Sequence, residues 1–567
     1  MPNPQHLTSV PAHIVEQLIA WRLSAERNLH RALVVLSGER VWCHSIAQDY
    51  FGAAALAKIW LGDGLAETVP ANKARQMLGE EYGLAVVDAW SGLHPDALAA
   101  VAGTVLAGGV LLLLVPPWDA WLDCADPDYA RLATYPRDGS TLSRHFIAHI
   151  QQVLQAHAVR EKLLVLHQQD YPAGVSQSFL PWTLKNTATA LITPTSQQQQ
   201  AMDALRVHRG VSVLLAERGR GKSAVLGFAA RDYEAQGLRV LLCAPSRAAA
   251  GSVFRHAQVP VGFCAPDMLL QDETLDADVL LIDEAAAIPL PMLLQLLARF
   301  PHCVLATTTE GYEGTGQGFV LRFLRALDQR APGWQLLRLQ NPVRWAAGDP
   351  LEACLYDMLL LDAQESNMTT ANVQTGSVQL ECISQSSLLG NADLLRDVFG
   401  LLRSAHYRTT PDDLRFLLDG PAVSLYRLHH EGTTLAVVLL VEEGEIDVAM
   451  AELIAAGKRR PRGHMLVQTL AVHMQQPQYL QQRVARVVRI AVHTQYQRLG
   501  LGSSLLQAVV DDQQQRGVAY IGSSFSATPD VLAFWERNGF ALLRIGHRKQ
   551  AASAAPAALV LRHVVEV

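Results

Sequence analysis

The chain has 567 residues, of which half are apolar and 18% are charged, and its formal net charge is −6. Such a length exceeds what one hydrophobic core supports and predicts roughly three or four domains. The acidic balance excludes a uniformly cationic binder, so any contact with nucleic acid requires local basic patches. The seven cysteines occur singly, without Cys-x-x-Cys pairs or zinc-ligand spacing. We therefore expect no structural metal, no signal peptide and a reducing, cytoplasmic location.

The first region, residues 1–170, alternates aliphatic strands with helices. Strands are predicted at Ala32–Leu36, Leu84–Val87 and Val110–Val115, which favours a parallel sheet covered on both faces. The uncharged stretch Ala97–Val115 is long enough to span a membrane. Because Gly108-Gly109 divides it, we expect instead a buried helix over Asp96–Ala107 followed by a strand, and no membrane partner.

The second region, residues 190–350, contains a sequence typical of a phosphate-binding loop between an apolar strand and a helix. Residues Ala216–Ser223 match G-x-x-x-x-G-K-[ST], except that Ala216 replaces the first glycine. Backbone N–H groups from Gly219 onward would surround a β-phosphate at a helix N-terminus. Lys222 would neutralise the phosphate oxygens and Ser223 would bind Mg²⁺.

Two acids follow a second apolar strand of this region, Val279–Ile282. Asp283 would hold Mg²⁺ through water, and Glu284 would polarise the attacking water. Gln197 follows Thr-Pro at the position where helicase-like proteins read adenine, or it is a solvated residue of a glutamine run. Arg344 would touch the γ-phosphate or form a surface ion pair.

The third region, residues 355–567, carries a second phosphate-binding pattern. The strand Val487–Val492 precedes Gln497–Gly502 and a predicted helix, an arrangement in which backbone amides approach a pyrophosphate. A later strand, an aromatic helix and Gly539-Phe540 resemble the end of the GNAT acetyltransferase fold. An acetyl carbonyl would lie along Ile490–Val492, where backbone N–H groups polarise it. Trp535 stands where many GNAT enzymes have a tyrosine that protonates the leaving thiolate.

His493 ends the central strand of this region and could accept the proton of an attacking amine, or it could cap the loop. The densest basic run precedes a strand predicted at Met465–Ala471, and we name it the basic loop (Lys458–His464). It predicts phosphate contacts to RNA from Lys458, Arg459, Arg460, Arg462 and His464. The alternative is a solvated loop.

Together these motifs resemble the bacterial tRNA(Met) cytidine acetyltransferase family over nearly the whole chain. In the first region the resemblance rests on Ala97–Ala107 with Gly108-Gly109 and the leucine run that follows. In the other two regions it rests on Arg218–Ser223, Asp283–Pro289, Gly311–Gly316, Pro342–Ala346, Arg460–His464, Arg489–His493 and Gln497–Gly502. It implies an α/β protein with three parts: an N-terminal doubly wound domain, a P-loop helicase-like (RecA-like) ATPase and a GNAT domain.

The resemblance further implies acetyl transfer from acetyl-CoA to N4 of the wobble cytidine of elongator methionine tRNA, driven by ATP or GTP with Mg²⁺. By position, nucleotide contacts fall on Gln197, Gly219, Arg220, Gly221, Lys222, Ser223, Ala224, Asp283 and Arg344. Acetyl-CoA contacts fall on Ile490, Ala491, Val492, Gln497, Arg498, Leu499, Gly500, Leu501, Gly502 and Ser503. A family Glu–Arg pair falls on Asp530 and Arg537, with the acid one methylene shorter.

Members of this family usually continue into a C-terminal tRNA-binding domain, whereas this chain ends at Val567. We therefore expect the basic loop, the ATPase and the first region to hold the tRNA. Two other functions fit the motifs: a nucleotide-gated lysine acetyltransferase, and an RNA-remodelling ATPase with a CoA-binding module. The basic loop favours RNA over lysine as the substrate.

Overall fold

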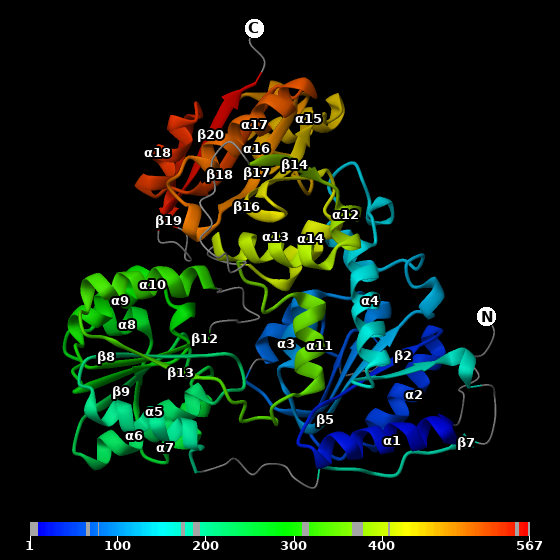
Figure 1. Cartoon of the computed structure of the whole chain (residues 1–567), viewed down its shortest axis with the longest axis vertical. Helices are drawn as coiled ribbons and strands as arrows, with labels where there is room; N and C mark the ends of the chain where they lie inside the picture. Colours follow the sequence, from blue (N-terminus) through cyan, green and yellow to red (C-terminus); the bar gives the residue numbers. More distant parts are fainter. Residues whose placement is uncertain are drawn as a thin grey trace. The chain divides into compact units, whose positions relative to one another are not determined.

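The computed structural model describes residues 10–63, 68–77, 79–171, 176–184, 193–308, 317–365, 378–405, 409–549 and 555–564. The chain forms two compact units (Figure 1). The first comprises Met1–Pro127, His149–Leu361 and Thr410–Asp412, and the second comprises Asp128–Ala148, Asp362–Thr409 and Asp413–Val567. Residues 128–148 thus leave the first region of the sequence and pack with the acetyltransferase-like region.

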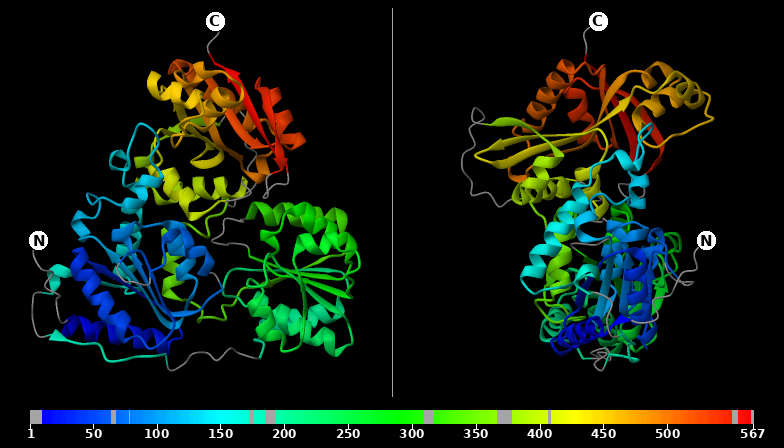
Figure 2. Two further views of the ribbon diagram at one scale, coloured as in Figure 1. Left: turned by 180° about the vertical axis from the view of Figure 1, so that it is seen from behind. Right: turned by 90° about the vertical axis from the view of Figure 1, so that its right-hand side faces the viewer.

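The N-terminal part of the first unit is built on a parallel five-stranded sheet of order β3-β4-β5-β2-β6. Its strands are β2 (Ala32–Ser37), β3 (Lys58–Leu61), β4 (Tyr82–Asp88), β5 (Val105–Val115) and β6 (Leu164–His167). The helices around it are α1 (Ala12–Arg27), α2 (Arg40–Ala53), α3 (Pro95–Ala102), α4 (His145–Val159) and α11 (Pro350–Leu359). Figure 2 shows this helix-covered sheet from two further sides. A short antiparallel pair joins β1 (Val10–Pro11) to β7 (Ser176–Gln177).

One boundary predicted in this sheet is wrong. The helix expected over Asp96–Ala107 ends at Ala102, and β5 already begins at Val105. Gly108 and Gly109 lie inside the strand, where the register with β4 shifts. Gly108 has φ +75°, and a Cβ on Gly109 would lie 2.7 Å from the Gly83 carbonyl oxygen. The glycine pair therefore makes a bulge with close backbone contact rather than a helix end.

In the described part of the chain, no helix has both the length and the apolar character that crossing a membrane requires. The uncharged stretch of the first region forms the short helix α3 and the buried strand β5.

The nucleotide-binding part of the first unit is a parallel six-stranded sheet of order β10-β9-β11-β12-β8-β13. Its strands are β8 (Val211–Ala216), β9 (Val240–Cys243), β10 (Gly262–Cys264), β11 (Val279–Ile282), β12 (Cys303–Thr308) and β13 (Gln335–Leu339). The helices are α5 (Ser196–Val207), α6 (Lys222–Ala235), α7 (Gly251–Ala257), α8 (Pro266–Gln271), α9 (Leu290–Arg299) and α10 (Gln317–Arg330).

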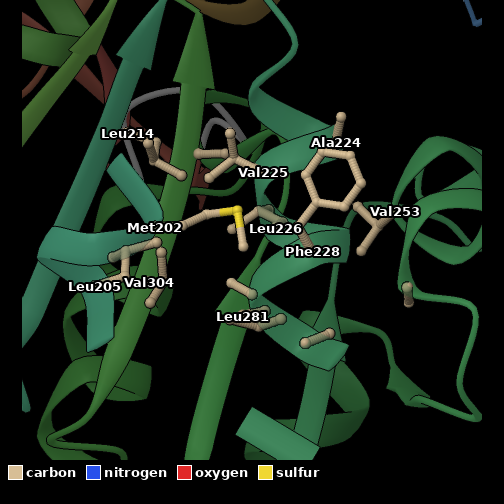
Figure 3. Close-up of a cluster of buried hydrophobic side chains, with 14 of the residues drawn as sticks. Met202, Leu205, Leu214, Ala224, Val225, Leu226, Phe228, Val253, Leu281 and Val304 are labelled. Atoms are coloured by element: carbon tan, nitrogen blue, oxygen red, sulfur yellow. The ribbon is translucent and has the colours of Figure 1, made fainter. Parts of the chain in front are cut away.

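The core of this part lies between α6 and the central strands. Val225 and Phe228 of α6 pack with Leu214, Leu281 and Val304 in one buried cluster (Figure 3). Strands β8 and β11 are parallel and only β12 lies between them, so the loops that follow both strands leave the same carboxyl edge of the sheet.

The second unit contains a mixed seven-stranded sheet of order β14-β15-β16-β17-β18-β20-β19. Its strands are β14 (Gln379–Ile383), β15 (Val423–His430), β16 (Thr433–Gly444), β17 (Arg483–Val492), β18 (Tyr520–Ser526), β19 (Ala541–Lys549) and β20 (Pro556–His563). Its helices are α12 (Gln385–Gly390), α13 (Ala392–Ala405), α14 (Pro411–Asp419), α15 (Val448–Ala455), α16 (Met465–His473), α17 (Leu501–Gln515) and α18 (Pro529–Arg537).

The strand predicted over Met465–Ala471 is wrong, because these residues form α16. Leu466, Val467, Leu470 and Ala471 are buried. This is the spacing of one helical face, and a strand would have buried alternate residues instead. Glu443 of β16 accepts hydrogen bonds from the backbone N–H groups of Leu466 and Val467, which holds the helix N-terminus against the sheet.

Candidate functional site

The phosphate-binding loop (Glu217–Gly221) joins β8 to α6 at the carboxyl edge of the six-stranded sheet. Gly219 and Gly221 have φ +76° and +78°, a left-handed conformation that non-glycine residues rarely adopt. Gly221 is the N-cap of α6, so the backbone N–H groups of the loop and of the first helical turn are available to an anion. Lys222 and Ser223 begin the helix, and Ala224 lies in its first turn.

Four side chains predicted to bind nucleotide or metal lie together beside this loop. Lys222 Nζ is 3.3 Å from Glu284 Oε1. Ser223 hydrogen bonds to Asp283, which is fully buried at the end of β11. Burial and the neighbouring Glu284 charge raise the pKa of Asp283 to about 7. Burial also acts to raise the pKa of Glu284, but Lys222 and Arg218 outweigh it, so the pKa of Glu284 is lowered.

The geometry around Asp283 fits a magnesium ion held mainly by nucleotide. Its Oδ2 is buried and has no hydrogen-bond partner, so one carboxylate oxygen is available as a ligand. Among the described residues, no three His, Cys, Asp or Glu side chains group as a metal site. Mg²⁺ at NTP sites needs only one or two protein ligands, because phosphate oxygens and waters supply the others. Asp283 and Ser223 meet that requirement.

Gln197 and its neighbour Gln198 both hydrogen bond to backbone groups near the phosphate-binding loop, but to different segments. Gln197 Oε1 accepts the backbone N–H groups of Gln340 and Asn341, each at 3.0 Å. Gln198 was not singled out from the sequence, yet its Nε2 donates to Gly221 O at 3.1 Å. It also completes a capping box with Thr195, and the T-x-x-Q spacing before a helix is the sequence signal that could have identified it.

Among the described residues, the Arg344 side chain forms its hydrogen bond and its ion pair with the N-terminal part of this unit and not with the phosphate-binding loop. Its guanidinium lies 3.7 Å from Glu81 Oε1 and donates to the Gly103 carbonyl at 3.4 Å. The neighbouring residues do contact the loop: the Val343 N–H donates to Gly219 O at 2.8 Å. The residues Gly311–Gly316 that contributed to the family resemblance lie outside the described residues.

In the second unit, β17 and β18 separate along their length. They pair in parallel only from Val484–Tyr520 to Val487–Ser523, after which β17 stays with β16 and β18 with β20. The His493 N–H bonds to Leu435 O on the β16 side. Since N–H groups alternate sides along a strand, those of Val492 and Ile490 point toward the gap. Backbone donors in such a gap can polarise a thioester carbonyl.

The acetyl-CoA loop (Gln497–Gly500) follows this strand and precedes α17. Arg498 and Gly500 have φ +65° and +84°, and Gly500 is the N-cap of the helix. Gln497 Nε2 donates to Val492 O at 3.2 Å, which ties the loop to the end of β17. Leu499 is exposed, Leu501 is buried, and Gly502 and Ser503 lie in the first helical turn. Ile490, Ala491 and Val492 are thus joined to a helix N-terminus that can bind a pyrophosphate.

His493 is buried and participates in the turn after β17. Its Nδ1 accepts the Gln495 N–H at 3.3 Å, and its Nε2 lies 3.9 Å from Glu365. Trp535 is also buried, stacked on Phe525 and edge-on to Phe540. The Trp535 indole therefore packs in the core, at the position where many GNAT enzymes have a tyrosine.

The two residues predicted to contact acetyl-CoA from the last helix of this domain, Asp530 and Arg537, form no hydrogen bond or ion pair with each other. Asp530 and Arg537 lie at opposite ends of α18, both exposed. Arg537 Nε donates to the Ala533 carbonyl at 2.9 Å.

The basic loop divides into an exposed and an anchored half. Lys458, Arg459 and Arg460 are exposed. Arg462 Nη1 donates to Ala130 O, and the Arg462 carbonyl accepts the Tyr135 N–H.

His464 ends the anchored half and is buried. Its Nδ1 accepts the Gly444 N–H at 3.0 Å and its Nε2 donates to Tyr135 O at 2.6 Å. Residues 128–148 therefore hold the loop from one side.

Comparison with known proteins covers all three parts of the chain. Residues 6–168 match the family described as tRNA(Met) cytidine acetyltransferase TmcA, N-terminal. Residues 213–362 match the RNA cytidine acetyltransferase NAT10/TcmA helicase domain, and residues 397–512 match GNAT acetyltransferase 2. The expected doubly wound, helicase-like and GNAT folds are thus confirmed in their predicted order.

Several similar curated proteins are named tRNA(Met) cytidine acetyltransferase TmcA. That of Nitrosococcus halophilus is 36% identical over 574 aligned residues, covering 95% of this chain and 76% of the relative. That of Pectobacterium atrosepticum is 37% identical, covering 94% and 76%, and that of Salmonella typhimurium is 35% identical, covering 94% and 76%. The chain spans about three quarters of the length of these relatives.

Proposed function

Because this chain belongs to the tRNA(Met) cytidine acetyltransferase family, we propose that it acetylates N4 of the wobble cytidine of elongator methionine tRNA. Acetyl-CoA supplies the acetyl group, and ATP or GTP hydrolysis drives the reaction. The observation that carries this proposal is the presence of two phosphate-binding loops in one chain, one before α6 and one before α17, each at a helix N-terminus.

Acetyl transfer requires positioning more than covalent help from the protein. The cytidine N4 is a weak nucleophile because its lone pair is delocalised into the ring, and the base must leave its stack to reach the thioester. N4 attacks the carbonyl carbon, a tetrahedral oxyanion forms, the C–S bond breaks, and CoA leaves as thiolate while N4 loses a proton. The N–H groups of Ile490 and Val492, which face the gap beside β18, stabilise the oxyanion.

The nucleotide contacts explain why either purine would serve. Both lone pairs of Gln197 Oε1 are occupied by backbone donors, so only its amide N–H groups face a ligand. Donors match N7, an acceptor that adenine and guanine share. Mg²⁺, held by Asp283 and Ser223 with the phosphates, would neutralise charge on the transferred group, and Glu284 would orient the attacking water.

The exposed half of the basic loop supports RNA as the substrate. Lys458, Arg459 and Arg460 are exposed and form no ion pair with any residue that the structure describes, so they are available to phosphates. Arg462 and His464 contribute by holding the loop in one conformation. All seven cysteines are free thiols, which supports a cytoplasmic location.

The proposal is tested by incubating the protein with labelled acetyl-CoA, ATP and bulk tRNA, followed by nucleoside analysis. We expect the label in N4-acetylcytidine and only when ATP or GTP is present. Label in lysine residues of protein, with none in cytidine, would support the lysine acetyltransferase alternative and contradict the proposal.

Removing the charges of the exposed half of the basic loop is expected to lower the affinity for tRNA. The affinity that remains should depend less on salt concentration. The triple variant Lys458→Ala, Arg459→Ala, Arg460→Ala removes up to three phosphate contacts. The slope of log affinity against log salt should therefore fall in magnitude by about 2. The control variant Arg459→Lys, Arg460→Lys keeps the charge of the same exposed residues and should keep the slope. An equal loss of affinity and slope in both variants would reject phosphate contacts as the role of this surface.

Replacing His493 separates proton transfer from loop positioning. Its buried ring accepts the Gln495 N–H, so we expect His493→Ala to lower stability by about 1 kcal/mol, as loss of a helix cap does. The pH–rate profile of single-turnover acetyl transfer should keep its shape. Disappearance of the acidic limb of that profile would instead identify His493 as the general base.

A further inference from the structure

A tryptophan from the segment after β13 packs directly on the phosphate-binding loop. Trp345 is 5% exposed. A Cβ added to Gly219 would lie 2.8 Å from Trp345 Cη2, so the ring contacts the bare glycine backbone. The hydrogen bond from Val343 N–H to Gly219 O fixes the same point of the loop from the backbone side. Trp345 therefore limits how far Gly219 can move outward.

The Trp345 ring is also covered by an arginine of the N-terminal domain. Arg31 immediately precedes β2, and its guanidinium carbon lies 3.4 Å from the Trp345 ring centroid. The residue is 1% exposed. A planar guanidinium stacked on an indole gains cation–π attraction that a lysine reproduces poorly in this geometry.

Arg31 is itself held rigidly. Its backbone N–H and Nη2 donate to the two Asp349 oxygens at 2.6 and 2.8 Å, and its Nη1 donates to Ala102 O at 2.9 Å. Asp349 in turn caps α11 through the Glu352 N–H. Because the pair is fully buried, removing the guanidinium would leave an unpaired carboxylate in the protein interior.

Helix α11 also contacts the phosphate-binding loop. Glu352 Oε1 lies 3.0 Å from Arg220 Nη1, and the Tyr356 hydroxyl donates to Glu217 at 3.0 Å. Arg220 is 7% exposed, so its side chain faces the protein while its backbone remains in the loop. Asp349, which binds Arg31 and caps α11, thus links the Trp345 contact with the loop to the contacts that α11 makes with the loop.

We propose that Arg31 is a positioning residue of the nucleotide site, and that the N-terminal domain thereby completes the ATPase. Arg31 fixes the orientation of the Trp345 ring, and that ring restricts the position of Gly219. The conformation of Gly219 in turn directs the loop N–H groups toward the β-phosphate. The inference rests on the proposed nucleotide site. The N-terminal domain thereby affects nucleotide affinity rather than the hydrolytic step, because none of these side chains contacts Asp283 or Glu284.

The chain contains a matched control for this arrangement. Arg22 is also a buried arginine of the N-terminal domain, stacked 4.6 Å from the Trp182 ring and paired with Glu26 at 3.1 Å. Its contacts stay within that domain. Arg22→Lys and Arg31→Lys therefore remove the same kind of interaction, but only Arg31 is linked to the phosphate-binding loop.

The test compares the two variants in the full-length chain by binding of a fluorescent ADP analogue and by steady-state ATP hydrolysis. We expect Arg31→Lys to raise Kd and the KM for ATP about tenfold, equivalent to about 1.4 kcal/mol, with little change in kcat. Arg22→Lys should lower Tm about as much as Arg31→Lys does, but it should leave Kd unchanged. If Arg31→Lys does not fold, Trp345→Leu tests the other end of the contact with the same expectation.

Two outcomes separate this inference from the proposed function. Equal Kd values for the unsubstituted protein and Arg31→Lys, or an equal rise in Arg22→Lys, would overturn the positioning role alone. Failure of the unsubstituted protein to bind nucleotide would overturn the nucleotide site, and the inference with it.

Discussion

Lys222→Met is expected to reduce nucleotide hydrolysis by about a hundredfold or more, the range found when one preorganised charge or donor is removed from a reacting group. Lys222 Nζ lies 3.3 Å from Glu284 and would contact the β- and γ-phosphate oxygens when nucleotide binds. Its loss removes that charge and also the cation that lowers the Glu284 pKa. Phosphate release under saturating ATP measures the effect, and tRNA acetylation should fall with it.

Two controls make this result specific. Lys58→Met removes another partly buried lysine of the same unit, one that donates to Phe51 O and Ala54 O, and should leave hydrolysis unchanged. Acetyl-CoA binding by Lys222→Met, followed by calorimetry, should match the unsubstituted protein because that loop belongs to the other unit. Hydrolysis at the normal rate in Lys222→Met would reject the assigned nucleotide site.

Gly500→Val is expected to weaken acetyl-CoA binding by about 10- to 100-fold. Gly500 caps α17 with φ +84°, and a branched side chain there costs about 1–3 kcal/mol of backbone strain. Apart from its own chain neighbours, Gly500 has no described residue within 4 Å of the added Cβ, so the side chain would project into open space beside the helix N-terminus. That space is where a pyrophosphate would approach the loop amides.

Gly517 provides the matched control for this substitution. It follows the opposite end of the same helix with φ +74° and also has open space around its Cβ. Gly517→Val should lower Tm about as much as Gly500→Val does, yet bind acetyl-CoA normally. Equal weakening of acetyl-CoA binding in both variants would attribute the effect to the stability of α17 and reject the assigned loop.

The secondary-structure predictions failed in two segments whose sequence pattern fits both a helix and a strand, so that tertiary contacts decide between them. Residues Met465–Ala471 are mostly apolar, so period alone did not distinguish a strand from α16; contact with the sheet and the Glu443 cap decided it. The helix predicted to Ala107 was wrong because a glycine pair can end a helix or bend a strand. Close approach to the Gly83 carbonyl favours the second.

By itself, the sequence determined the three-part α/β organisation, the order of the domains and the position of both phosphate-binding loops. These features depend on short-range physics: a glycine-bearing turn between a strand and a helix N-terminus is specified by neighbouring residues.

Only the tertiary structure decided which partners hold those loops. Arg31 and Trp345 are separated by more than 300 positions in the chain, and so are Tyr135 and His464. No periodicity or motif links such residues, because their contact depends on how whole sheets and helices pack. The tertiary structure therefore joined the N-terminal domain to the nucleotide loop, and residues 128–148 to the basic loop.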